Sequence, residues 1–169
     1  QALLEVANKS AVELTSTDLG FALGPRLNAA GRLDDMSIGI ACLITDDKSM
    51  ARDIAIELDA LNQERRQIEK SMQLSADAHL QQLNAIDDDA LPNAICLYDP
   101  SWHQGVIGIL ASRIKERYHR PTICFAQATD DENNTIIKGS ARSIDGLHIR
   151  DALDTVAVSY THLTLPTSP

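Results

Sequence analysis

The stretch DDKSMARDIAIELDALNQERRQIEKSMQLSADAHLQQL, residues 46–83, contains neither glycine nor proline. Its apolar residues recur at the spacing of one helical face: Met50, Ile54, Leu58, Leu61, Ile68, Met72 and Leu83. Asp46 and Asp47 stand where the N-terminus of a helix favours acidic side chains. The pattern predicts a mostly continuous helix from about Lys48 to about Leu80, which either joins two domains or belongs to a helical bundle.

The residues on the two sides of this helix differ in character. Residues 1–45 read as short helices around one loop, LGPRLNAAGRLDD, residues 23–35. The acidic stretch AIDDDALPN, residues 85–93, predicts a domain boundary. Beyond it we expect a strand, a helix, two strands joined by a turn, and a last helix, at residues 94–99, 106–118, 122–126, 135–143 and 146–156. This order predicts a small α/β domain.

Composition excludes several classes of protein. The 169 residues hold 44% hydrophobic residues, enough for a core, and no apolar run long enough to span a membrane. Three isolated cysteines lack the pairing of a zinc site and are expected to be buried, reduced thiols. The net charge of −9 argues against nucleic-acid binding as a whole. Between His103 and Arg150, however, seven cationic residues face five acidic ones, so a locally positive face is possible.

Three clusters of residues suit a phosphate. The first is GPRLNAAGR, residues 24–32, where Arg26 and Asn28 lie between Gly24 and Gly31 and Arg32 follows directly. Two guanidiniums and an amide in one loop can hold phosphate oxygens. The alternative is a loop between helices whose arginines pair with Asp34 and Asp35.

The second cluster is WHQGVIGILASR, residues 102–113. His103 follows a strand, and Gly105 and Gly108 lie at the start of the next helix, where free N–H groups and the helix dipole favour an anion. Close packing of the helix on the sheet is the competing reason for the glycines.

The third cluster closes the last predicted strand with a turn of two cations and two hydroxyls beside a glycine. Its residues are Lys138, Gly139, Ser140, Arg142 and Ser143. This set suits an anion with several oxygens, although a solvated strand end is the alternative. Because strand-end loops of an α/β sheet gather at one edge, we expect this turn to lie beside the His103 loop. No His or Asp cluster has metal-ligand spacing, so no metal ligand is assigned.

The segments at residues 21–44, 58–69, 102–126 and 138–153 resemble the RecJ family of bacterial single-strand-specific exonucleases, in the DHH phosphoesterase superfamily. The resemblance runs from about Leu3 to Val156. It implies an α/β architecture in three parts: the helical end of a DHH catalytic domain (residues 1–45), a long connecting helix (46–85) and a truncated DHH-associated α/β domain (92–157). Residues 158–169 read as a non-native tail.

The resemblance also implies a function. The family hydrolyses phosphodiesters from the 5′ end of single-stranded DNA, in repair and recombination, with two Mn²⁺ or Mg²⁺ ions. The ligands of these ions belong to N-terminal motifs, including Asp-His-His, that do not occur here. We therefore expect an internal fragment, inactive alone, that supplies contacts to the DNA backbone.

The residue roles implied by the resemblance follow the three clusters. His103 would lie by the scissile phosphate, Ser140 and Arg142 would hold the backbone near its 5′ end, and Arg26, Asn28 and Arg32 would line the catalytic-domain side. A helicase and a single-strand-binding protein are implied as partners of a cytoplasmic monomer with no membrane contact. The alternatives are a DHH-family phosphodiesterase acting on short RNA or cyclic dinucleotides, and a non-catalytic nucleic-acid-binding module.

Overall fold

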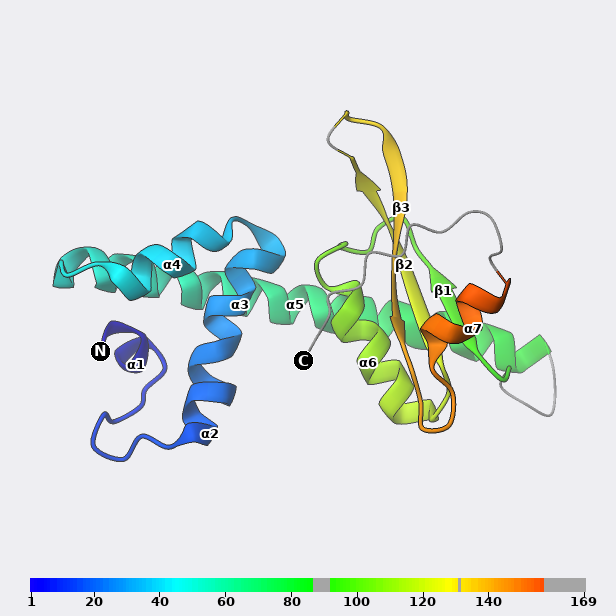
Figure 1. The fold of residues 1–169 in the computed structure, drawn as a ribbon, viewed down its shortest axis with the longest axis horizontal. Helices are drawn as coiled ribbons and strands as arrows, with labels where there is room; N and C mark the ends of the chain where they lie inside the picture. The colour runs from blue at the N-terminus through cyan, green and yellow to red at the C-terminus, as the bar shows by residue number, and fades with distance from the viewer. Residues whose placement is uncertain (87–91, 131, 157–169) are drawn as a thin grey trace.

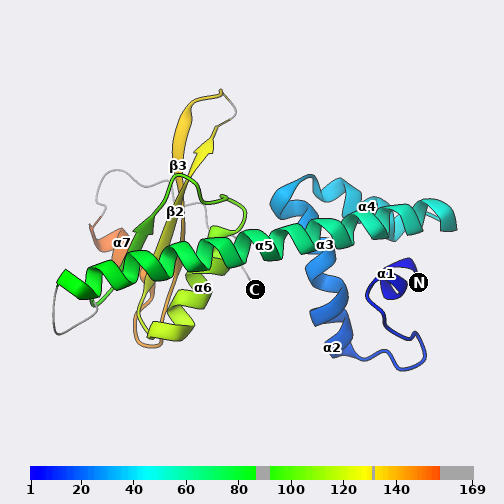
Figure 2. The ribbon, with the colours of Figure 1, turned by 180° about the vertical axis from the view of Figure 1, so that it is seen from behind.

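One helix of 39 residues, α5 (Lys48–Ile86), organises the molecule. At about 1.5 Å per residue it is about 58 Å long. The computed structural model describes residues 1–86, 92–130 and 132–156. Figure 1 and Figure 2 show α5 running the full length of the molecule, with helices gathered on its first half and the sheet on its second half. The predicted long helix is thus confirmed, whereas most of the expected boundary at residues 85–93 and the tail at 158–169 lie outside the described residues.

The first half of α5 carries a helical lobe. Its elements are α1 (Ala2–Val6), α2 (Ser16–Asp18), the π-helix η1 (Leu19–Leu23), α3 (Gly24–Leu33) and α4 (Met36–Ile44). Leu58 of α5 is fully buried here, with Ile54 and Leu61 half-buried beside it, as the apolar spacing predicts. Residues from α1, α3 and α4 complete this core: Leu3, Ala30 and Cys42.

The predicted loop at residues 23–35 is wrong, because the structure forms α3 there. Pro25 lies in the first turn of α3, where a missing N–H costs nothing and the fixed φ suits a helix. Ala29 and Ala30 are fully buried and give the helix its packed face. Gly31 lies where an added Cβ would be 3.2 Å from the sulfur of Met36, so it allows α4 to turn back closely.

The second half of α5 carries the α/β lobe. Its elements are β1 (Ile95–Tyr98), α6 (Ile107–Tyr118), β2 (Thr122–Thr129), β3 (Thr135–Arg142) and α7 (Ile149–Val156). The sheet order is β1-β2-β3, with β1 parallel and β3 antiparallel to β2. This confirms the predicted order of strands and helices.

The core of the α/β lobe lies between the sheet, α6 and α5. Leu110 of α6, Ile95 of β1 and Leu80 of α5 are almost fully buried in it. Leu33, at the end of α3, packs against the same core, so the two lobes touch. Two ion pairs connect α6 to α5, Arg113–Glu69 with an N···O distance of 3.3 Å and Arg117–Asp77 with one of 2.8 Å.

Only one face of β1 is buried, because its residues alternate between core and solvent. Cys96 therefore points outward and is exposed, which corrects the expectation that all three cysteines are buried. Cys42 and Cys124 are buried as expected. None of the helices within the described ranges combines the length and the apolar character needed to cross a membrane.

Candidate nucleic-acid interface

Ser140 and Arg142 lie inside β3 and not in a turn after it, which corrects the prediction for this stretch. In the antiparallel register they pair with Cys124 and Thr122 of β2, both fully buried. Side chains two apart in a strand share a face, so both point from the sheet toward α6. The two side chains lie on the face of the sheet that α6 covers, and they approach Gly108 at the start of α6, so the expected position near the His103 loop is confirmed.

The guanidinium of Arg142 is held by hydrogen bonds on two sides. Its Nε donates to Ser112 Oγ at 2.7 Å, and its Nη1 donates to Ser140 Oγ at 3.1 Å and to the carbonyl of Ala141 at 2.8 Å. Ser112 Oγ in turn donates to the carbonyl of Gly108 at 3.1 Å. The orientation of the guanidinium is thereby fixed before any ligand binds.

Two donors of this arrangement stay available. Nη2 of Arg142 has no protein acceptor among the described residues. Ser140 Oγ accepts from Arg142, so its own hydroxyl proton is free to donate. Both groups are half-buried, where a charge-assisted hydrogen bond to an anion is stronger than in water.

Gly108 makes room for these two donors in the first turn of α6. A Cβ at this position would lie 2.8 Å from Nη2 of Arg142 and 3.1 Å from Ser140 Oγ. No backbone acceptor is found for the Gly108 N–H among the described residues, as expected at a helix N-terminus. Gly108, Ser112, Ser140 and Arg142 are called the Arg142 cluster below.

The His103 loop lies between the Arg142 cluster and the helical lobe. His103 Nδ1 accepts from the N–H of Gly105 at 3.1 Å, so a neutral ring carries its proton on Nε2. Gly105 touches the end of α3, where an added Cβ would lie 2.0 Å from the carbonyl oxygen of Arg32. Arg32 Nη1 donates to the carbonyl of Gly105 at 3.1 Å. The two lobes therefore meet at Gly105 and Arg32.

Positive charge concentrates at this junction. The pKa of Arg32 is lowered, first by desolvation of its guanidinium and then by the charges of Arg65 and Arg142, while Glu69 acts in the opposite direction. The guanidiniums of Arg65 on α5 and Arg142 on β3 thus each repel that of Arg32 on α3. An anion bound among them would relieve that repulsion.

A second network of hydrogen bonds joins helix α5 to the turn in which His103 lies. Asp99, just after β1, accepts from the N–H and the hydroxyl of Ser101, and Ser75 of α5 donates to it at 3.0 Å. Trp102 Nε1 donates to Ser75 Oγ at 3.3 Å. The hydrogen bonds that Asp99 accepts, those from Ser101 first and then that from Ser75, lower its pKa.

The other predicted residues lie apart from this junction or serve the fold. Arg26 pairs with Asp59 at 2.7 Å, and its other nitrogens donate to the carbonyls of Ala22 and Val6, so it joins α3 to α5. The suggested pairing of the loop arginines with Asp34 and Asp35 is not seen. Asn28 is exposed on α3 and has no hydrogen bond to a described side chain.

The three remaining residues of the third cluster differ in their surroundings: one is exposed, and two have structural roles. Lys138 is exposed. Gly139 lies on the opposite face of β3, beneath the ring of Phe125, where a Cβ would be 2.5 Å from Cε1. Ser143 Oγ accepts from the N–H of Ile149 at 3.1 Å and caps the start of α7.

Sequence reasoning missed two residues at the junction. Ser112 follows Gly108 by four residues, so both fall on one face of α6, a spacing that could have revealed the pair. Arg65 lies in the glycine-free helix, and nothing in its local pattern separates it from other surface cations. It donates to Glu69 at 2.6 Å and to the buried Asn62 at 3.3 Å.

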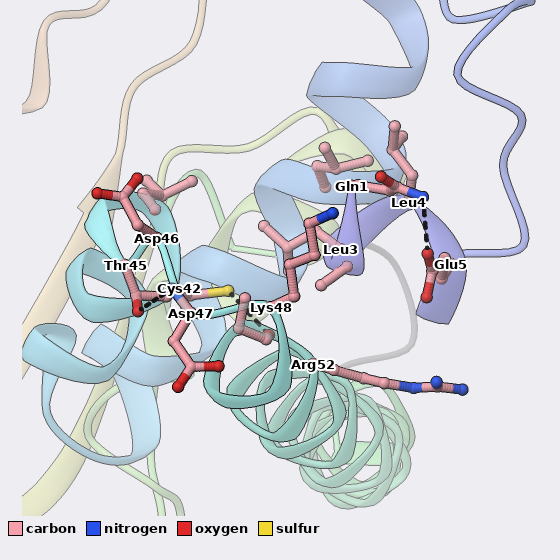
Figure 3. Close-up of a pocket in the computed structure, with 14 residues that line it drawn as sticks. Gln1, Leu3, Leu4, Glu5, Cys42, Thr45, Asp46, Asp47, Lys48 and Arg52 are labelled. Atoms are coloured by element: carbon pink, nitrogen blue, oxygen red, sulfur yellow. Dashed lines mark hydrogen bonds between the residues drawn. The ribbon is translucent and has the colours of Figure 1, made fainter.

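A hollow elsewhere takes no part in this arrangement. About 520 Å³ in volume, it lies between α1, the end of α4 and the start of α5 (Figure 3). Acidic and basic side chains mix along it, among them Asp47 and Arg52, and burial raises the pKa of Cys42. No residue that the sequence singles out for phosphate binding lines it.

The described residues do not fit a metal site. Among residues 1–86, 92–130 and 132–156, no group of three or more His, Cys, Asp or Glu side chains could hold an ion. The chemistry of the junction is that of hydrogen-bond donors and fixed positive charge.

Comparison with known proteins finds relatives that match nearly the whole chain. The model of the DHHA1 domain matches residues 91–162. The single-stranded-DNA-specific exonuclease RecJ of Escherichia coli is 56% identical over 165 residues, which are 98% of this chain and 28% of that protein. RecJ of Bacillus subtilis is 34% identical over 152 residues, 18% of its length. The chain thus spans about 28% of the length of the first of these relatives.

Solved structures agree with the sequence comparison. RecJ from Thermus thermophilus in complex with Mg²⁺ superposes with a TM-score of 0.71 at 30% identity, over 92% of this chain and 22% of that one. An exonuclease RecJ bound to manganese superposes with a TM-score of 0.68 at 32% identity, over 89% of this chain and 34% of that one. The lobes and the long helix are therefore those of a known architecture.

Proposed function

This chain belongs to the RecJ family, and on that premise we propose that its two lobes hold the 5′ end of single-stranded DNA for a 5′-to-3′ exonuclease. The observation that carries the proposal is the Arg142 cluster. Its guanidinium is oriented by Ser112 and Ser140, and Gly108 leaves space beside Nη2. A terminal phosphate offers several oxygens, which suits a guanidinium, a hydroxyl and a free backbone N–H together.

The roles of the residues follow from their positions. Ser140 and Arg142 bind the phosphate from the α/β side, and Arg32 approaches it from the helical lobe. His103, with its proton on Nε2, donates to an oxygen of the neighbouring phosphodiester as the catalytic residue of this chain. Lys138, exposed on the same strand, adds charge along the backbone.

The other residues predicted to contact DNA have partners within the protein or lie on an exposed face, and the proposal treats them accordingly. Arg26 has its nitrogens committed to protein acceptors, so the proposal does not use it as a DNA contact. Gly139 and Ser143 act through packing and capping, and Asn28 stays a prediction on an exposed face.

We place the division of the chain where the sequence puts it, at residues 1–45, 46–85 and 92–157. Mg²⁺ and Mn²⁺ accompany the solved relatives. Because the described residues do not fit a metal site, the ligands of these ions in the parent protein would lie elsewhere. We further propose that the parent acts as a cytoplasmic monomer, beside a helicase and a single-strand-binding protein that expose and present the strand.

A salt titration of binding to 5′-phosphorylated single-stranded DNA tests the proposal. Loss of one phosphate contact should flatten the slope of log K against log salt by about 0.7. We expect this from Arg142→Ala, with a smaller loss of affinity from Ser140→Ala, because that change removes a neutral donor. Arg52→Ala, an exposed cation on α5, is the matched control, and circular dichroism checks folding. Unchanged affinity and slope in Arg142→Ala would sink the proposal.

A further inference from the structure

The hydroxyl group of Ser75 on α5 connects the long helix to two residues of the turn that carries His103. Its Oγ donates to Oδ2 of Asp99 at 3.0 Å and accepts from Nε1 of Trp102 at 3.3 Å. Ser75 is half-buried and Trp102 is 3% exposed, so water competes little for these bonds. His79, one turn further along α5, lies with its ring centroid 6.1 Å from that of Trp102. The long helix therefore contacts the indole at two successive turns.

The other hydrogen bonds of this turn are local. Oδ1 of Asp99 accepts from the N–H of Ser101 at 2.9 Å and from its hydroxyl at 2.6 Å. The N–H of Trp102 donates to the carbonyl of Asp99 at 3.1 Å. Bonds between residues so close in sequence fix the shape of the turn, but they do not fix its position against α5. That position depends on the bonds to Ser75 and on the packing of the indole.

His103 lies between this anchor and the start of α6. Its carbonyl accepts from the N–H groups of Val106 at 3.0 Å and Ile107 at 3.2 Å, and its Nδ1 accepts from the N–H of Gly105 at 3.1 Å. These bonds hold the residue on its C-terminal side. On its N-terminal side one planar peptide joins it to Trp102, with the two Cα atoms about 3.8 Å apart. A displacement of Trp102 is therefore passed directly to His103.

Removal of the Ser75 hydroxyl would cause such a displacement. The indole N–H is a donor only, and a buried donor without an acceptor is unfavourable, so Trp102 would move toward another acceptor or toward water. Asp99 would also lose its only hydrogen bond to α5 among the described residues, while keeping those from Ser101. The turn would keep its shape and lose its attachment to the helix.

We propose that Ser75 is a positioning residue for His103 and that, through Trp102 and Asp99, it fixes the imidazole beside the phosphodiester. The proposal rests on the proposed function for the role of His103 toward DNA. The competing role is purely structural: the bonds of Ser75 would add stability, and α6 alone would set the place of the ring. The two roles differ in what the loss of the hydroxyl does to the imidazole.

The test compares three variants of the 169-residue chain. Ser75→Ala removes the hydroxyl, and the helix should persist because alanine is the best helix former. Ser75→Thr keeps a hydroxyl on the same carbon. Ser71→Ala makes the same change at an exposed position one turn earlier on α5 and is the matched control. The measurements are the ¹⁵N chemical shift of His103 Nδ1, hydrogen exchange of the Gly105 amide, the melting temperature, and binding of a 5′-phosphorylated dinucleotide.

We expect Ser75→Ala to move the Nδ1 shift, to speed exchange of the Gly105 amide and to bind the dinucleotide roughly fivefold more weakly, the effect of one lost hydrogen bond. Ser75→Thr and Ser71→Ala should resemble the wild type in all three. A lower melting temperature of Ser75→Ala with unmoved His103 and Gly105 signals would overturn the proposal in favour of the structural role. So would equal changes in Ser71→Ala or in Ser75→Thr.

Failure of the proposed function has a different signature. The wild type would then bind dinucleotides with a 5′-phosphate and with a 5′-hydroxyl equally. The changes in the His103 and Gly105 signals of Ser75→Ala would remain, because they are measured without DNA.

Discussion

Gly105→Ala tests whether the two lobes are held together at the His103 loop. The added Cβ would lie 2.0 Å from the carbonyl oxygen of Arg32 and 2.9 Å from its carbonyl carbon. Both are backbone atoms at the end of α3, so no flexible side chain can yield. The loop must withdraw by about 1 Å to reach the 3.0 Å below which real Cβ atoms are essentially never found.

The cost follows from this geometry. Overpacking of this kind destabilises by about 1–3 kcal/mol. Withdrawal also breaks the hydrogen bond from Arg32 to the Gly105 carbonyl, worth about 1 kcal/mol. We expect a loss of about 3 kcal/mol, which lowers the melting temperature of a chain of this size by roughly 6–12 °C.

The assay is thermal and urea unfolding followed by circular dichroism. Gly20→Ala is the matched control, because no heavy atom lies within 4 Å of its added Cβ and the residue is helical. Alanine there should be neutral or stabilising by up to about 1 kcal/mol. Equal stability of Gly105→Ala and the wild type would refute the close contact between the lobes.

Three further predictions concern the thiols, acid stability and activity. In native protein, a thiol reagent should label the exposed Cys96 quickly and leave Cys124 unreacted, because burial raises the pKa of Cys124 to about 12. Mass spectrometry after labelling measures both, and equal labelling of the two cysteines would contradict the burial of Cys124. The hydrogen bonds that lower the pKa of Asp99 stabilise the fold fully above its ordinary value of 3.8, and this contribution is lost as pH falls through the lowered pKa. Asp99→Asn should therefore show a shallower fall of melting temperature below about pH 4 than the wild type, and parallel curves would contradict this role. The purified chain should release no nucleotides from single-stranded DNA with Mn²⁺ or Mg²⁺, since its described residues do not fit a metal site; metal-dependent release would disprove this.

The sequence predicts the long helix and the order of the α/β lobe because their signals are local. The apolar spacing around Leu58 and the absence of glycine and proline need no knowledge of partners. The same local reading fails at residues 24–33, where Pro25 and two glycines suggest a loop. Pro25 is harmless in a first helical turn, and the close approach of Met36 that Gly31 allows becomes visible only in three dimensions.

The candidate site could likewise be predicted only in part from the sequence. The residue types at Ser140 and Arg142 indicate an anion, but their position on the covered face of β3 depends on the register with β2. Arg26 has the same chemistry as Arg32, yet its partner Asp59 lies 33 residues away. Sequence alone cannot rank the two arginines, because long-range pairing decides which guanidinium stays available.

The preference of the chain for a 5′-phosphate over a 5′-hydroxyl, on otherwise identical single-stranded DNA, tests the central claim most directly. Both ligands share every internal phosphate, so their difference reports only the terminal one. The account predicts that the wild type binds the phosphorylated strand more tightly, that Arg142→Ala abolishes the difference, and that the control variant Arg52→Ala preserves it. An equal preference in the wild type and in Arg142→Ala would contradict the assignment of the Arg142 cluster to the 5′ end.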